Sequence, residues 1–240
     1  MNKKLRYILF ITLALGVALS FFLVTQNDNR APETITKEPE VAAQNTLKII
    51  AFGDSLTAGY GVSQNEAYPA QLEVLLEDAG YQVSVLNAGV SGETTRGNLE
   101  RANFIRSQNP DIVSVGIGGN DALRALPIEE TRKNIIETLR ILKSDEGAPH
   151  IQLHEMQAPL NAGTEYKTEF DTLFQTIARD EELTLIPFIT PEIFLDTANK
   201  ISDGIHYNKQ GYARVVTQYI LPELLTVLDG RADINNYKSF

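Results

Sequence analysis

Three residues of this sequence have the types that together perform nucleophilic catalysis. Ser55 follows an apolar run, and Asp203 and His206 lie close together in a polar stretch near the C-terminus. A serine hydroxyl attacks a carbonyl carbon only when a nearby base takes its proton, and histidine suits that role because its ordinary pKa lies near neutral pH. A carboxylate on the other ring nitrogen fixes the tautomer and stabilises the imidazolium. We therefore predict that Ser55, His206 and Asp203 are catalytic.

Attack by a serine also requires hydrogen-bond donors for the negative charge that develops on the carbonyl oxygen. The backbone N–H groups of Ser55 and Gly89 and the side-chain amide of Asn120 are the candidates for this oxyanion hole. Glycine at position 89 has no Cβ to block the approach of a substrate to the backbone.

The elements that position these residues alternate between strand and helix. Short β-rich runs are separated by segments with apolar residues at helical spacing, such as 68–80 and 94–107, and the chain closes with a helix at 211–225. Strands are predicted at 47–52, 81–89, 111–121, 151–159 and 183–187. Strands that are joined by single helices form a parallel sheet covered on both faces, so the fold class is α/β.

The candidate residues all fall at or just beyond the carboxyl ends of the predicted strands, or in the loop before the last helix. Ligands of open parallel sheets bind at this edge. Each segment also has a purely structural explanation: Asp54 would brace the serine turn, and residues 118–121 and 203–204 are compatible with ordinary turns. We expect His150 and His154, in or beside the fourth strand, to have no functional role. The joint occurrence of complementary catalytic types at one edge favours the catalytic interpretation.

Composition excludes several classes of function. The 240 residues carry a formal net charge of −10, with no cysteine and three histidines. An acidic chain is poorly suited to nucleic acid, whose binding requires clustered Lys and Arg. The absence of cysteine excludes disulfides, thiolate nucleophiles, cysteine-based metal sites and a lipid-modified cysteine.

The first 25 residues have the composition of an export segment. Lys3, Lys4 and Arg6 precede an uncharged apolar run at 7–24. This pattern predicts either a cleaved signal peptide or a retained signal-anchor helix, which would associate the chain with the membrane. Either one leaves the positive end in the cytoplasm, so we expect the rest in the periplasm or on the extracytoplasmic face of the inner membrane.

The remaining chain is predicted to form one catalytic domain. Residues 26–45 are polar and proline-containing, which is typical of a linker. The α/β domain is expected at 46–226, and residues 227–240 are predicted to be a polar C-terminal tail.

Four blocks of the sequence resemble those of the SGNH (GDSL) hydrolases, in the same order. The blocks are Gly53-Asp54-Ser55-Leu56, Asn87-Ala88-Gly89-Val90-Ser91-Gly92, Gly119-Asn120-Asp121 and Asp203-x-x-His206. The segment Met156–Tyr166 is similar to a substrate-side loop of the bacterial arylesterase and thioesterase/lysophospholipase branch. One departure is Tyr207, which stands where many relatives have proline.

The resemblance implies a three-layer αβα, flavodoxin-like fold with a central parallel sheet of about five strands. It implies Ser55 as nucleophile, His206 as base and Asp203 as its partner, with Ser55, Gly89 and Asn120 as oxyanion donors. Such enzymes need no metal or cofactor, and many accept small acyl esters, thioesters and lysophospholipids.

We therefore predict a serine esterase that acts through an acyl-enzyme. Leu123, Leu126 and Leu160 are candidates for contact with an apolar acyl group. Three alternatives remain open: a carbohydrate O-deacetylase acting on cell-envelope glycans, a transacylase, and a catalytically silent binding domain tethered at the membrane.

Overall fold

The computed structural model describes residues 45–144 and 147–238. The predicted export segment and nearly all of the predicted linker lie outside these residues. Within them, no helix is long and apolar enough to cross a membrane. All of the described residues belong to one compact unit.

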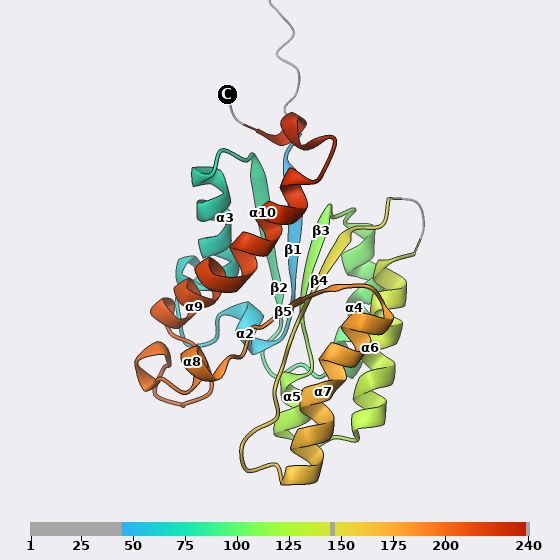
Figure 1. Ribbon diagram of the computed structural model, residues 1–240, viewed down its shortest axis with the longest axis vertical. Coiled ribbons are helices and arrows are strands. Elements are labelled where there is room, and N and C mark those ends of the chain that lie inside the picture. The colour runs from blue at the N-terminus through green and yellow to red at the C-terminus, as the bar shows by residue number, and fades with distance from the viewer. Residues whose placement is uncertain (1–44, 145–146, 239–240) are drawn as a thin grey trace, which may run out of the picture. The chain divides into compact units, whose positions relative to one another are not determined.

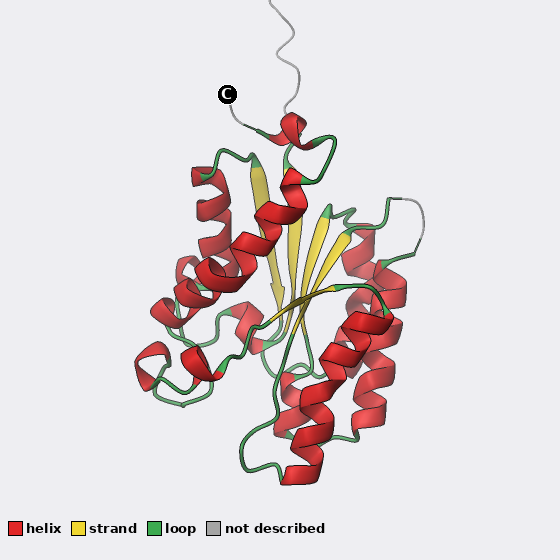
Figure 2. Ribbon diagram, viewed as in Figure 1, coloured by secondary structure: helices red, strands yellow, loops and turns green. Residues whose placement is uncertain are grey.

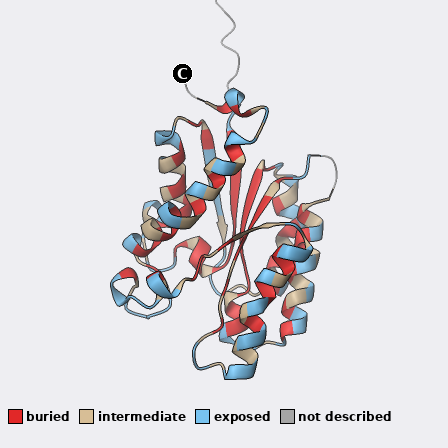
Figure 3. Ribbon diagram, in the orientation of Figure 1, coloured by how far each residue is buried: buried red, intermediate tan, exposed pale blue. Residues whose placement is uncertain are grey.

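The centre of the domain is a parallel sheet of five strands, as predicted. The strands are β1 (Leu47–Gly53), β2 (Val83–Gly89), β3 (Ile112–Gly116), β4 (His150–His154) and β5 (Thr184–Ile186), in the spatial order β2-β1-β3-β4-β5. Every pair of neighbours is parallel, with Gly53 opposite Gly89 and Gly116. All five residues of β3 are buried because helices cover both faces of the sheet, which explains its apolar sequence (Figure 3).

Helices form the two outer layers (Figures 1 and 2). One layer contains α3 (Tyr68–Asp78), α9 (Lys209–Val215) and α10 (Leu221–Asp229), and the other contains α4 (Thr95–Ser107), α6 (Ile128–Leu142) and α7 (Thr164–Asp180). In α6 the buried residues recur at a spacing of three or four, which puts one face on the core: Ile128, Thr131, Ile135, Thr138, Leu139 and Leu142. This three-layer αβα arrangement confirms the predicted fold class.

Short helices occupy the edge where the strands end. They are α2 (Ser55–Ala58), α5 (Gly119–Leu123) and α8 (Pro191–Phe194), each of which follows a strand after a brief connection. The predicted third strand therefore stops at Gly116, and the Gly119-Asn120 segment opens a helix.

The C-terminal region differs from the prediction of a polar tail at 227–240. Helix α10 extends to Asp229, and a turn at Ile234–Tyr237 buries both of its terminal side chains. The N–H of Gln82 donates to the carbonyl of Tyr237, and Tyr81 pairs with Lys238. Ile234 and Tyr237 are spaced so that both reach the core from this mostly polar segment, and the folded domain therefore continues to at least Lys238.

Candidate active site

The tight turn between β1 and α2 fixes the position of Ser55. Asp54 caps α2, since its carboxylate accepts a hydrogen bond from the N–H of Leu56 at 3.0 Å. Ser55 is the first residue of the helix, so its own N–H has no acceptor within the helix. The hydroxyl and this N–H are thus presented together at the carboxyl edge of the sheet.

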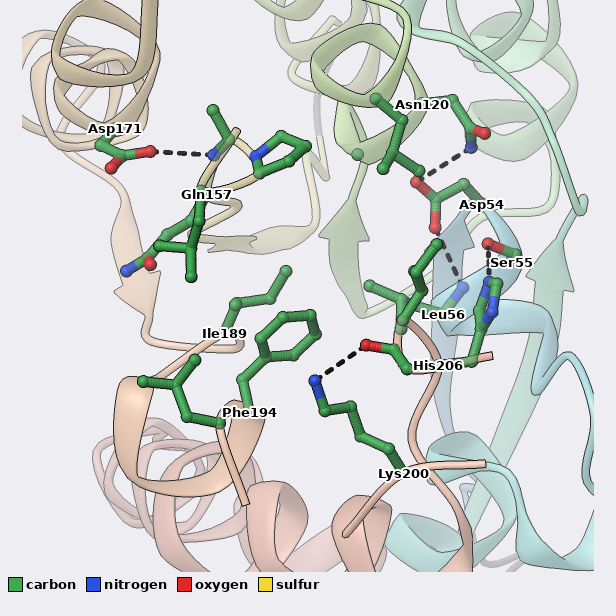
Figure 4. A pocket seen from close by; sticks show the side chains of 18 of the residues that line it. Asp54, Ser55, Leu56, Asn120, Gln157, Asp171, Ile189, Phe194, Lys200 and His206 are labelled. Atoms are coloured by element: carbon green, nitrogen blue, oxygen red, sulfur yellow. Dashed lines mark hydrogen bonds between the residues drawn. The ribbon is translucent and has the colours of Figure 1, made fainter. Parts of the chain in front are cut away.

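A continuous hydrogen-bonded chain joins the three predicted catalytic residues, and Figure 4 shows its contact between His206 and Ser55. The Nε2 of His206 lies 2.7 Å from the Oγ of Ser55, and its Nδ1 lies 2.6 Å from an Oδ of Asp203. Residues 151 positions apart in sequence are therefore in direct contact. This geometry allows His206 to take a proton from Ser55 while Asp203 holds the opposite ring nitrogen.

The loop that carries His206 is organised by its own hydrogen bonds. The other Oδ of Asp203 accepts from the N–H groups of Ile205 and His206, at 2.8 and 3.0 Å. Burial would raise the pKa of the Asp203 carboxyl, but these N–H groups and the His206 ring outweigh burial and lower it. Asp203 is therefore held as a carboxylate, which is the form that orients an imidazole.

Tyr207 attaches the same loop to the core. Its side chain is fully buried, and its hydroxyl donates to the carbonyl of Phe188 at 3.0 Å. The ring packs edge-on against Phe188, Phe194 and Tyr212. The residue that departs from the family pattern therefore fixes the position of the neighbouring His206 by packing and by one hydrogen bond.

Asn120 lies beside the serine turn, as predicted. Its amide nitrogen donates to the carbonyl of Glu93 at 3.0 Å, and it lies 3.5 Å from Asp54 (Figure 4). Because the contact with Asp54 is long, one of the two amide hydrogens of Asn120 is only weakly bonded and is available to a substrate oxygen.

The structure does not support Gly89 as an oxyanion donor. Its N–H already donates to the side-chain oxygen of Asn87 at 3.0 Å. A Cβ at position 89 would lie 2.2 Å from the backbone nitrogen of Ala58, so glycine is needed here for close packing of β2 on α2. Gly89 therefore has a structural reason to be glycine.

Gly92, in the same sequence block, is a candidate oxyanion donor that its residue type and spacing did not distinguish from Gly89. Its φ of +81° is in the left-handed region, and its N–H donates no hydrogen bond to any of the residues that the structure describes. The residue after Gly92 is Glu93, whose carbonyl accepts the hydrogen bond from the Asn120 amide. Gly92 therefore lies close to Asn120 in the structure. Gly89 and Gly92 are three positions apart in the sequence. Only the hydrogen bonds of the folded chain show which of the two has a free N–H.

A mainly apolar cavity of about 580 Å³ opens beside Ser55 and His206. Leu123 and Leu160 line it, whereas Leu126 does not. Leu126 lies further along the chain after α5 and accepts a hydrogen bond through its carbonyl from Tyr166. The opposite wall was not predicted from the sequence and includes Ile189, Pro191, Phe194, Leu195 and Ile205. These residues come from the irregular region after β5, where no periodic pattern marks a side chain as facing a site.

Asp54 is the buried acid of the site. It is 1% exposed, and burial raises the pKa of its carboxyl to about 7, with a smaller contribution from the nearby Asp121 and Glu93. Its position between the N–H of Leu56 and the amide of Asn120 connects the serine turn to α5.

The other two histidines lie away from the cavity. His154 is fully buried, stacks on Phe188 and shares a hydrogen bond with Ser114, and burial lowers its pKa to about 3. His150 opens β4, at the end of the strand opposite to the site. Across residues 45–144 and 147–238, no group of three or more His, Asp or Glu side chains is placed to hold a metal ion.

Comparison with known proteins identifies the family. The model of the GDSL-like lipase/acylhydrolase family matches residues 51–214. An arylesterase of Vibrio mimicus is 30% identical over 166 residues, which cover 69% of this chain and 82% of that protein. Thioesterase 1/protease 1/lysophospholipase L1 of Escherichia coli K12 is 34% identical over 169 residues, covering 70% and 78%. The crystal structure of AlinE4, an SGNH-hydrolase family esterase, superposes with a TM-score of 0.61 at 35% identity and covers 77% of this chain and 97% of its own. The chain therefore belongs to the GDSL-like, or SGNH, lipase/acylhydrolase family.

Proposed function

We propose that this protein is a serine esterase in which Ser55, His206 and Asp203 are the catalytic triad. The observation that carries the proposal is the hydrogen-bonded chain from Asp203 through His206 to Ser55 at the wall of an apolar cavity. Membership of an acylhydrolase family supports the same reaction class.

In the proposed reaction, the Oγ of Ser55 attacks the carbonyl carbon of an acyl ester while the Nε2 of His206 takes its proton. The carbonyl oxygen becomes negative and accepts hydrogen bonds from the N–H groups of Ser55 and Gly92 and from the Asn120 amide. His206 then returns its proton to the departing alcohol or thiol, leaving an acyl-enzyme. Water, deprotonated by His206, attacks this ester. The bond to the Oγ of Ser55 then breaks, His206 returns the proton to that oxygen, and the acid is released.

The cavity supports substrates with an apolar acyl group. Its volume of about 580 Å³ and its leucine, isoleucine and phenylalanine walls suit an acyl chain longer than acetyl. Aryl esters, thioesters and lysophospholipids, the classes named for the relatives, are the proposed substrates.

The catalytic domain is proposed to be exported, on the basis of the export segment at residues 1–24. Alkaline phosphatase fused after residue 45 would be active only if that is correct.

Hydrolysis of p-nitrophenyl esters from acetate to palmitate tests the proposal with the full-length chain and with Ser55→Ala. We expect turnover with an optimum beyond acetate, and a loss of at least about 10³-fold in kcat in the variant. Ser63→Ala, in an exposed turn, is the matched control and should keep the activity. An acetate optimum would favour the O-deacetylase, and equal turnover by Ser55→Ala would exclude Ser55 as nucleophile.

A further inference from the structure

Lys200 lies against the loop that carries the proposed catalytic histidine. Its backbone pairs with that of Tyr207, and the N–H of the next residue, Ile201, donates to the carbonyl of His206 at 3.0 Å. The side chain lines the same cavity as Ser55 and His206. Figure 4 shows the Nζ of Lys200 directed into this cavity beside Phe194.

The charge of Lys200 is not neutralised by the protein. Its Nζ donates to the carbonyl of Gly204 at 2.8 Å and lies 4.0 Å above the centre of the Phe194 ring, and both partners are uncharged. No Asp or Glu of the described chain forms an ion pair with it. Lys167, the other lysine of the cavity wall, pairs with Asp171 at 2.5 Å.

An ammonium group in this setting can bind an anion. It has three N–H donors, and Gly204 takes one, so two remain for a ligand. Hydrogen bonds in which a partner is ionised are about twice as strong as those between neutral groups. The acidic body repels anions at long range, so a preference for an anionic substrate must come from local contact.

We propose that Lys200 forms an anion subsite of the active site, which selects acyl esters that carry a phosphate or carboxylate group. The proposal rests on the proposed esterase function and names a substrate class within it. Two parts of an ester can carry this anion: the acyl chain and the departing alcohol.

Two pairs of esters test the subsite and distinguish these two sources. One pair is p-nitrophenyl hydrogen suberate and p-nitrophenyl octanoate, which differ by a carboxylate on the acyl chain. The other is 1-octanoylglycerol 3-phosphate and 1-octanoylglycerol, which differ by a phosphate on the alcohol. The readout is the ratio of kcat/KM for the anionic ester to that for its neutral partner, measured with the full-length chain.

In one of the two pairs, Lys200→Gln is expected to lower this ratio about tenfold, and Lys200→Arg to retain most of it. Rising salt should lower the ratio for the wild type and leave that of Lys200→Gln nearly constant. Lys133→Gln removes the same charge from the exposed face of α6 and should leave both ratios unchanged.

A ratio that Lys200→Gln leaves unchanged in both pairs would overturn the subsite. Equal losses on anionic and neutral esters would also overturn it, because Lys200 would then act only by holding Gly204 and the histidine loop. If the wild type hydrolysed none of the four esters, the proposed function would fail, and the subsite with it.

Discussion

At the scale of single residues, the site combines a partly exposed chain of three hydrogen-bonded residues with one buried acid. Ser55, His206 and Asp203 are joined by hydrogen bonds of 2.6–2.7 Å, whereas Asp54 lies beneath them and is withdrawn from water. The two carboxyl groups have opposite pKa shifts because three hydrogen bonds to the loop outweigh burial at Asp203, and burial dominates at Asp54. One acid is therefore suited to orient a base, and the other to brace the turn.

Asp54 makes the stability of the protein depend on pH. Its folded-state pKa of about 7 exceeds the value of 3.8 for an ordinary aspartate, so between these values the folded state holds a proton that the unfolded state releases. This contribution to stability is complete below about pH 4 and is lost as the pH rises through 7. Asp54→Asn cannot lose a proton. Between pH 5 and pH 8 the wild type should therefore lose about 2–3 kcal/mol of unfolding free energy relative to this variant. Urea titration at each pH measures the difference.

The exposed Asp180→Asn, at the end of α7, is the control for this experiment. Its pH profile should follow that of the wild type. Parallel profiles for wild type and Asp54→Asn would show that Asp54 is already ionised at pH 5 in the folded protein.

Part of the site could be predicted from the sequence, for a physical reason. Parallel strands end at one edge, so residue types that follow separate strands converge there, and Ser55 and Asn120 do so. The roles of Gly89 and Leu126 could not be predicted in this way. Whether an N–H is already bonded, or a leucine faces a cavity, depends on contacts between segments far apart in the chain.

At the scale of elements, the region after β5 carries more of the site than its sequence indicates. Strands and long helices could be predicted because their apolar spacing repeats. Residues 188–208 have no such repeat, yet they supply one wall of the cavity and the histidine loop. Tyr207 holds this region to the core, and Phe188 and Phe194 pack around its ring.

Tyr207→Phe tests how this loop is held. The substitution keeps the ring and removes the hydroxyl, so the buried carbonyl of Phe188 loses its hydrogen bond. We expect a loss of about 1–3 kcal/mol in the free energy of unfolding, measured in urea. Tyr219→Phe is the control, because the Tyr219 hydroxyl has no hydrogen-bond partner in the described chain. Equal stabilities of the two variants would contradict the role given to the Tyr207 hydroxyl.

At the scale of the whole molecule, one sheet between two helix layers brings distant segments into a single domain. The C-terminal turn closes the end of the sheet opposite to the site, where Gln82 and Tyr237 are hydrogen-bonded. Composition predicted a tail here because charged and polar residues dominate the last fourteen positions, and it could not reveal that Ile234 and Tyr237 are buried.

Ile234→Ala tests whether this turn belongs to the domain. Ile234 is 8% exposed, so its truncation should lower the free energy of unfolding by about 2 kcal/mol or more. Ile136→Ala is the matched control on α6, where the side chain is 38% exposed and its loss should cost less than about 1 kcal/mol. Equal effects of the two substitutions in urea denaturation would mean that the C-terminal turn contributes no packing.

The most direct measurement of the central claim is covalent labelling with a fluorophosphonate, which reacts with an activated serine hydroxyl. Intact-protein mass should show one probe for each full-length chain, and peptide mapping should place it on Ser55. Labelling should be absent in Ser55→Ala and at least about 10³-fold slower in His206→Gln, because the base would be missing. A folded wild type that takes up no probe, or a Ser55→Ala variant that is labelled as fast as the wild type, would contradict Ser55 as the nucleophile.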